Sequence, residues 1–364
     1  MNHGNTTCQN GATTRKHRSL WLELFKVFLF YCVAWVHVGN NPTFLNLARM
    51  ALPMFFMVSG CYCYTERREG EEDETYQQRK VASTKKKIIS MFKYLAFGYA
   101  FWFLFDIVFK GFIQGENLAG VFKGFFVNDL FSQVFIYNHV NNSGGHMWFL
   151  LALFSISVVH YFITKAKIDK LYFFLPSLII VFFFFAVYLN KYEGDVVWGD
   201  MTRNALFFGL PCFATGFDIH YLVSKYVDTK AKKIVLASVS FAFAVSLFFL
   251  QLPEWKALGF NGECYISGFL SAAFFTSFFL LCPSPDPRYF SLITGTGLSF
   301  YAYIYHTAVA KVLDSYVTFV GNSRPYIIIS VSLAIAIVTH WLITLGKYVF
   351  HKVMKGRAFH WSLS

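Results

Sequence analysis

Long apolar runs alternate with short polar stretches along almost the whole chain of 364 residues. Each run is near 20 residues long, the length with which an α-helix crosses the roughly 30 Å hydrocarbon core of a bilayer. A helix satisfies its backbone hydrogen bonds internally, as a membrane requires, and the period-two alternation of barrel strands is not seen. The pattern predicts an all-α polytopic membrane protein with about ten transmembrane helices. The runs cover residues 21–39, 47–64, 88–109, 147–164, 171–190, 204–223, 234–252, 263–282, 289–310 and 326–350.

Lysine and arginine are unequally divided between the two sides of this predicted bundle. With a cytoplasmic N-terminus, 24 of the 32 basic residues lie in cytoplasmic segments or the helix ends beside them. This asymmetry agrees with the positive-inside rule and places both termini in the cytoplasm. We therefore expect cytoplasmic tails at residues 1–20 and 353–364, flanking a transmembrane domain at residues 21–352. The expected location is the cytoplasmic (inner) membrane.

Composition supports the membrane class and limits the partners. Hydrophobic residues make up 56% of the chain and charged residues only 14%, against about 25% in a typical soluble domain. The net charge of +12 follows from topology, so nucleic acid is not an expected partner, whereas membrane lipids are. The positive cytoplasmic face is suited to an anionic cofactor or anionic lipid. Seven scattered cysteines have neither metal-ligand spacing nor the pattern of a disulfide framework.

The first apolar run, "WLELFKVFLFYCVAWVHVGN", carries three ionisable residues. Glu23 and Lys26 stand near its cytoplasmic end, and His37 stands near its outer end. Eleven residues make almost three helical turns, so Lys26 and His37 share one face and lie roughly 16 Å apart along the axis. Glu23 precedes Lys26 by three positions and can pair with it. Ionisable residues at membrane depth are costly and indicate function, although either residue alone could also extend to its interface.

Two further histidines are expected at the same height as His37. His146 opens the fourth run in "GGHMWFLLALF", and His306 lies near the outer end of the ninth in "LSFYAYIYHTAVAK". Three converging histidines could bind a metal, but an acidic ligand and the helix spacing of a zinc motif are missing, so no metal is expected. A proton relay or acid–base chemistry is favoured, because imidazole titrates near neutral pH.

These features resemble the membrane acyltransferase-3 family, integral membrane O-acyltransferases that modify cell-envelope sugars. The family motif on the first helix is an acidic residue, a basic residue three positions later, and a histidine after ten more residues. Here it is Glu23, Lys26 and His37, with Lys where the family usually has Arg. Lysine keeps the charge but loses the bidentate guanidinium. The chain is expected to lack the extracytoplasmic esterase-like domain of some members.

Other segments are similar to the family in the same order along the chain. They are "ALPMFFMVSGCYCY", "KKKIISMFKY", "HMWFLLALF", "FFGLPCFATGF" and "LSFYAYIYHTAV". The resemblance extends from Trp21 to about Lys352. Together with the helix-one motif, it implies an acyl donor such as acetyl-coenzyme A entering from the cytoplasm. The implied acceptor is a hydroxyl of an envelope glycan or lipid-linked sugar outside.

Site residues are assigned on this basis. We expect His37 to act as general base, with Lys26, Glu23, His306 and Tyr305 as the other catalytic residues. Coenzyme A phosphates are expected at Lys85, Lys86, Lys87 and Lys93, and substrate contacts at His146, Trp148, Ser59 and Arg49. The thioester would reach His37 through a channel along the Lys26–His37 face. An oxyanion donor could come from Tyr305, His306, Trp148 or Ser59, and direct transfer is favoured over a covalent intermediate.

Two other classes of function compete with the enzyme. A proton-coupled transporter or glycolipid flippase would also use intramembrane histidines, but neither an internal repeat nor paired broken helices are found. A polymer-export or scaffold protein would need no buried histidine. The sequence leaves open the acceptor glycan, the choice between acetyl and succinyl, and the oligomeric state, although small residues in "SGFLSAAF" are compatible with helix packing between chains.

Overall fold

The computed structural model describes residues 20–125, 145–181, 183, 204–259, 265–283, 298–320 and 322–361. Within these ranges all regular secondary structure is helical, without a strand, which confirms the all-α prediction. The α-helices are α1 (Leu20–Val38), α2 (Pro42–Ala48), α3 (Ala51–Cys61), α4 (Asp73–Asp106), α5 (Leu118–Phe125), α7 (Trp148–Lys165), α10 (Leu210–Tyr226), α11 (Lys230–Leu258), α12 (Ile266–Leu281), α13 (Leu298–Tyr316) and α14 (Ser323–Trp361). Short 3₁₀ turns are η2 (Gly145–Met147), η3 (Asp169–Phe173) and η4 (Leu175–Ser177), and π-helical turns are η1 (Ile107–Ile113) and η5 (Ala205–Gly209).

Several of these helices are suited to a bilayer by length and composition. Among the described residues, six are long and apolar enough to cross one, namely Pro42–Cys61, Asp73–Ile113, Trp148–Lys165, Ala205–Tyr226, Lys230–Leu258 and Ser323–Phe350. Leu24–Val38 and Ile266–Leu281 are shorter apolar helices. The protein is therefore a multi-pass membrane protein. The predicted fifth run begins with the turns η3 and η4, and residues 182 and 184–190 of it lie outside the described residues.

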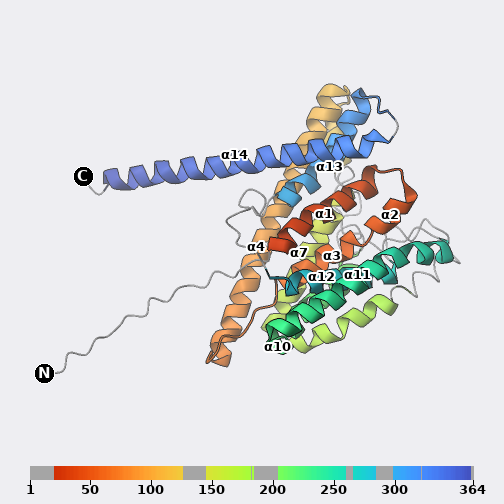
Figure 1. The fold of residues 1–364 in the computed structure, drawn as a ribbon. Helices are drawn as coiled ribbons and strands as arrows, with labels where there is room; N and C mark the ends of the chain where they lie inside the picture. The colour runs from red at the N-terminus through yellow and green to blue at the C-terminus, as the bar shows by residue number, and fades with distance from the viewer. Residues whose placement is uncertain are drawn as a thin grey trace.

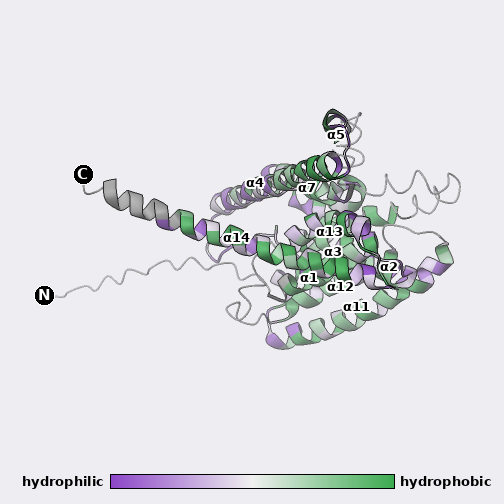
Figure 2. Ribbon diagram, turned by 90° about the horizontal axis from the view of Figure 1, so that it is seen from above, coloured by the Kyte–Doolittle hydropathy of each residue, from purple (hydrophilic) through white to green (hydrophobic). Residues whose placement is uncertain are grey.

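Helix α3 lies at the centre of the bundle and contacts α1, α10 and α12 (Figure 1). Helix α13 packs against α1 and α14, and α4 packs against α7. The start of α1 and the end of α14 lie on the same side of the bundle in Figure 1. Hydrophobic residues cover the central part of the bundle, and hydrophilic residues gather on α4 and at both ends of α11 (Figure 2). The assignment of one side to the cytoplasm remains a prediction.

Helices α3 and α10 cross with their backbones in close contact at two glycines. A Cβ atom on Gly60 would lie 1.9 Å from the carbonyl oxygen of Phe213, and one on Gly216 would lie 1.8 Å from that of Met57. Beside this crossing, the Cys61 thiol donates to the Gly216 carbonyl at 3.0 Å. The crossing therefore depends on the absence of a side chain at both positions.

The C-terminal end of α1 is held by the adjoining ends of α13 and α14. Arg324 forms a two-point ion pair with Asp314, at 2.7 and 2.6 Å, and donates a further hydrogen bond to the carbonyl of Val38. Carbonyl groups in the last turn of a helix have no intrahelical partner, so the guanidinium satisfies one of them. Nearby, Asn40 donates to Asn322 at 3.3 Å. These contacts fix the helix end that carries His37.

The polar segment before the third apolar run is more ordered than a solvated linker. Helix α4 begins at Asp73, 15 residues before the predicted start at residue 88. Its first turns are held by Gln77, which donates to the Thr164 carbonyl, and by the Lys80–Asp169 ion pair. Arg79 reaches back to Glu71 at 2.8 and 2.6 Å. Charged residues therefore extend this helix beyond its apolar part.

Candidate active site

Three histidines from distant parts of the chain come together near the end of α1. His37 lies in the last turn of α1, His146 in η2 before α7, and His306 in α13. The ring centroids of His37 and His146 are each 5.2 Å from that of His306, and 6.1 Å from each other. The structure thus brings together the histidines that the sequence predicts at one height. We call these three residues the histidine cluster.

Members of the cluster differ in their access to the surroundings. His306 is fully buried and His146 is 6% exposed, whereas the side chain of His37 is exposed. Because its ring also lies against the other two, His37 is directed toward the cluster and not only toward the bilayer. It is therefore the most accessible member of the cluster.

Helix α13 provides the hydrogen bonds that hold the two buried rings. Nδ1 of His306 lies 2.7 Å from the carbonyl oxygen of Tyr303. The Tyr303 hydroxyl in turn donates to the carbonyl of His146. Thr307 Oγ1 lies 3.1 Å from Nδ1 and 3.4 Å from Nε2 of His146. One helical turn of α13 therefore positions both His306 and His146.

An aromatic and charged layer surrounds the cluster on the side of α4. The buried ring of Trp102 packs edge-on against His146, with centroids 5.1 Å apart. The ammonium group of Lys311 lies 5.0 Å from the centre of the Trp102 ring, a cation–π contact. Asp106 is buried and pairs with Lys110 at 3.3 Å. The Trp102 indole thus contacts both His146 and the Lys311 ammonium group.

Tyr303, Thr307 and Trp102 were not expected at the site from the sequence, whereas Tyr305 was. Tyr305 instead packs against Phe101, with ring centroids 4.8 Å apart, and stacks on Tyr301. Only the position of α13 relative to η2 shows which tyrosine reaches the histidines. Thr307, directly after His306, is the residue that sequence adjacency could have indicated.

At the opposite end of α1, two lysines meet the last turn of α3. Lys26 Nζ lies 5.9 Å from the centre of the Tyr62 ring. Lys87 Nζ lies 2.9 Å from both the carbonyl oxygen of Ser59 and Sγ of Cys63. Both cations therefore gather at the negative end of the α3 dipole. The side chain of Glu23 lies outside the described residues, so its pairing with Lys26 stays a prediction.

The remaining predicted residues are spread over the bundle. Lys85, Lys86 and Lys93 are exposed on α4, so Lys87 is the member of this group that reaches the bundle interior. The hydroxyl of Ser59 donates to the Phe55 carbonyl at 2.9 Å within α3. Trp148 is buried against Phe56 and Phe149, and Arg49 is half-buried after α2. Within the described residues, no group of three His, Cys, Asp or Glu side chains could hold a metal ion.

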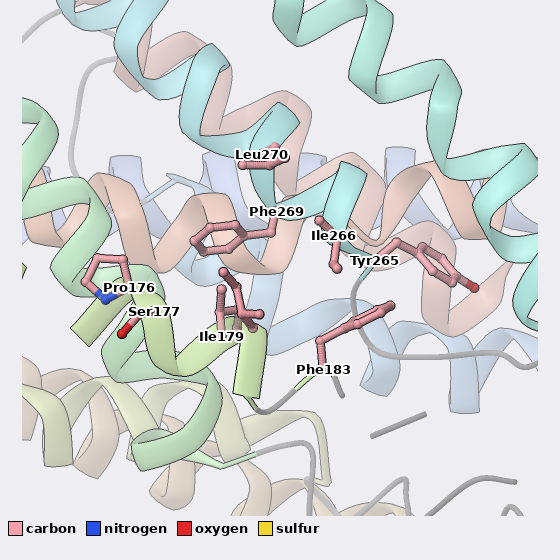
Figure 3. Close-up of a pocket in the computed structure, with 9 residues that line it drawn as sticks. Pro176, Ser177, Ile179, Phe183, Tyr265, Ile266, Phe269 and Leu270 are labelled. Carbon is pink, nitrogen blue, oxygen red and sulfur yellow. The ribbon is translucent and has the colours of Figure 1, made fainter. Parts of the chain in front are cut away.

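An apolar cavity lies apart from the histidine cluster and from the lysines near the end of α3. It has a volume of about 310 Å³ and lies between α12 and the segment that follows η4 (Figure 3). Ile179, Phe183, Phe269 and Leu270 are among its lining residues, and Tyr265 directs its hydroxyl away from them, to Asn46 at 2.6 Å. Its lining has neither an imidazole nor a cation. The cavity therefore offers nothing that could activate a hydroxyl or bind a phosphate.

Comparison with known families agrees with the resemblance seen in the sequence. The model of the acyltransferase-3 family, described as an acyltransferase domain, matches residues 19–345. That range contains the histidine cluster as well as Lys26 and Lys87. Comparisons with curated proteins and with solved structures give no significant match. The family match covers most of the 364 residues, so the chain belongs to the acyltransferase-3 family and is a multi-pass membrane O-acyltransferase.

Proposed function

We propose that the protein transfers an acetyl or related acyl group from cytoplasmic acyl-coenzyme A to a carbohydrate hydroxyl outside the cytoplasmic membrane. His37 acts as the general base. The observation that carries the proposal is the histidine cluster, in which one exposed imidazole lies against two buried ones. An acceptor from outside can approach the exposed ring, while the buried rings are shielded from water.

The donor is proposed to bind at the two lysines near the end of α3. Coenzyme A carries several phosphate charges, and an ammonium group binds phosphate as a point charge. Lys26 and Lys87 supply such charges inside the bundle, and Lys85, Lys86 and Lys93 extend the positive surface along α4. The pantetheine arm would then follow α1 over the roughly 16 Å between Lys26 and His37.

In the proposed reaction, the donor thioester and the acceptor hydroxyl meet at His37. The acceptor hydroxyl attacks the thioester carbon, and His37 takes the hydroxyl proton as the new C–O bond forms. The C–S bond then breaks, and His37 returns the proton to the departing thiolate of coenzyme A. A positioned base of this kind typically contributes about 10²- to 10⁴-fold in rate. The rings of Trp102 and Tyr303 beside the cluster restrict the entry of water, which strengthens the polar interactions within it.

Purified protein in detergent, radiolabelled acetyl-coenzyme A and an envelope glycan acceptor test this proposal. We expect label on the glycan with the unmodified protein and none with His37→Ala. A matched control is His340→Ala, which removes a half-buried histidine of α14. Full activity of His37→Ala would remove His37 from the mechanism. Movement of a substrate into vesicles without transfer of label would instead support a proton-coupled transporter or a flippase.

A further inference from the structure

Two buried polar atoms of α4 have no hydrogen-bond partner among the described residues. They are Nε1 of Trp102 and Oδ1 of Asp106. Trp102 has no exposed surface, and Asp106 is 1% exposed. Buried polar atoms almost always have a partner in native proteins, so an unpaired one requires an explanation. An unpaired carboxylate oxygen is especially costly in a membrane-spanning helix. These two atoms therefore indicate that a binding partner is missing here.

The two side chains lie on one face of α4, beside the histidine cluster. Trp102 and Asp106 are four residues apart, so their side chains are neighbours separated by one helical turn. The Trp102 ring packs against His146, with centroids 5.1 Å apart. Lys311 interacts electrostatically with both Asp106 and His146. The unpaired atoms are therefore close to the rings at which we place the reaction.

The chemistry of the two atoms limits what can bind them. An indole nitrogen only donates a hydrogen bond, whereas an ionised carboxylate only accepts one. A metal cation cannot accept from the indole of Trp102, and an inorganic anion would be repelled by Asp106. A hydroxyl group can both accept and donate, so hydroxyl groups satisfy both atoms. A sugar carries several of them on one ring.

Access to Asp106 depends on Lys110. The Lys110 ammonium group pairs with the other carboxylate oxygen of Asp106 at 3.3 Å, and the lysine side chain is 30% exposed. The carboxylate thus lies directly beneath a partly exposed side chain. Lysine has a flexible four-carbon stem, so its movement can admit a ligand without a change of the backbone. The π-helical turn η1 begins directly after Asp106, and such turns occur frequently at functional sites.

We propose that Trp102 and Asp106 bind non-reacting hydroxyls of the acceptor sugar and thereby select the hydroxyl that is acylated. This inference rests on the proposed function and adds a specificity site to it. The indole N–H of Trp102 donates to one sugar oxygen, and a sugar hydroxyl donates to Oδ1 of Asp106. A ring held at these two points presents one of its remaining hydroxyls to His37. Neither Trp102 nor Asp106 transfers a proton.

Sugar binding can be measured without any turnover. Protein labelled with ¹⁵N at its indole nitrogens is purified in a detergent without a sugar headgroup, such as lauryldimethylamine oxide. It is titrated with the methyl glycosides of glucose, galactose, mannose, rhamnose and N-acetylglucosamine. We expect at least one glycoside to shift the Trp102 signal, which is assigned by its loss in Trp102→Phe. The signal of Trp341, which is exposed on α14, should stay in place as an internal control.

An unchanged Trp102 signal with all of these glycosides would overturn the proposal. A buried water, or a direct bond between Trp102 and Asp106, would then account for the two unpaired atoms. A shift of the Trp102 signal that is equally large, at equal glycoside concentrations, in Asp106→Asn would also count against it, because the carboxylate would then not contribute to binding.

Two conservative variants test the selection of the hydroxyl. Trp102→Phe removes the indole N–H but keeps an aromatic ring beside His146, and Asp106→Asn keeps the shape of the side chain but removes its charge. We expect KM for the acceptor glycan to rise about 2- to 10-fold in Trp102→Phe and about 10- to 100-fold in Asp106→Asn, as the strengths of neutral and charged hydrogen bonds imply. KM for acetyl-coenzyme A should not change. The unmodified enzyme should acetylate one position of the sugar, and Asp106→Asn more than one.

Separate outcomes identify which idea fails. An unchanged KM for the acceptor in both variants, with an unchanged position of acetylation, would overturn the proposal while leaving acyl transfer by His37 intact. A parallel rise in KM for both substrates would show damage to the fold and would also count against it. Absence of acyl transfer by the unmodified protein would instead refute the proposed function. If Trp102→Phe does not fold, substitution of the other tryptophans, of the eight in the chain, assigns the Trp102 signal by elimination.

Discussion

The crossing of α3 and α10 makes a sharp prediction for Gly216→Ala. The new Cβ atom would lie 1.8 Å from the Met57 carbonyl oxygen, whereas ordinary Cβ contacts begin at 3.4 Å. Two backbones face each other at this point, so no flexible side chain can give way. The helices must separate by about 1.6 Å, and a gap of even 0.5–1 Å already loses a quarter to a half of a contact's dispersion energy. The bond from Cys61 to the Gly216 carbonyl would be strained as well.

The expected loss of folding stability in Gly216→Ala follows from two opposing effects. Overpacking of a tight contact costs typically 1–3 kcal/mol, and a backbone clash belongs at the upper end. Replacing Gly by Ala within a helix returns at most about 1 kcal/mol. The net destabilisation is therefore about 2 kcal/mol. A matched control is Gly346→Ala in α14, where a Cβ atom would meet nothing within 4 Å.

Thermal unfolding of the two variants in the same detergent provides the assay. The amount of folded protein left after heating is followed by size-exclusion chromatography. Gly216→Ala and Gly346→Ala should differ by about 3 kcal/mol, or roughly 5 °C in melting temperature, with Gly216→Ala the less stable. Equal melting temperatures would show that the helices accommodate a methyl group, and the close crossing would then not contribute to stability.

Three further predictions concern charged groups. Lys87→Glu should raise KM for acetyl-coenzyme A by about 10- to 100-fold, as expected for loss of a hydrogen bond from a charged group. The control Lys86→Glu, on the exposed side of α4, should raise KM much less. Equal effects of the two variants would contradict a donor site inside the bundle. Arg324→Gln should lower kcat several-fold with little effect on KM for the donor, because the end of α1 loses its anchor; an unchanged kcat would show that this anchor is dispensable. The hydrogen bond from Arg79 lowers the pKa of Glu71 from 4.5 to about 2, so the stability from this pair is complete above pH 4.5 and is lost as the pH falls toward 2. At pH 8, Glu71→Gln should therefore speed trypsin cleavage of the loop before α4, and an unchanged cleavage rate would count against this bond.

Much of the fold could be predicted because length and apolarity decide which segments enter a membrane. Residues 21–39 and 147–164 correspond closely to α1 and α7. The start of α4 at Asp73 was missed because its first turns are held by partners far along the chain, such as Asp169, and not by apolarity. The predicted run at residues 47–64 covers α3 but starts near the end of α2 (Pro42–Ala48), so most of α2 was missed.

The candidate site could be predicted only to the level of helix ends. Helix depth placed His37, His146 and His306 at one height, and the structure brings them together. The rotation of α13 about its axis is set by packing against α1 and α14, so the sequence could not show that Tyr303 faces the cluster and Tyr305 does not. Lys85, Lys86 and Lys87 could not be ranked as phosphate ligands from the sequence. Which of them points into the bundle depends on the rotation of α4 about its axis.

The bond from Arg324 to the carbonyl of Val38 joins residues 286 positions apart. During biosynthesis, the ribosome completes the first helix long before the turn that anchors it. A nascent chain with most of its spans inserted would thus still lack the anchor for the helix end that carries His37, and also α13 with His306. The histidine cluster would therefore be complete only after the final two helices have been made.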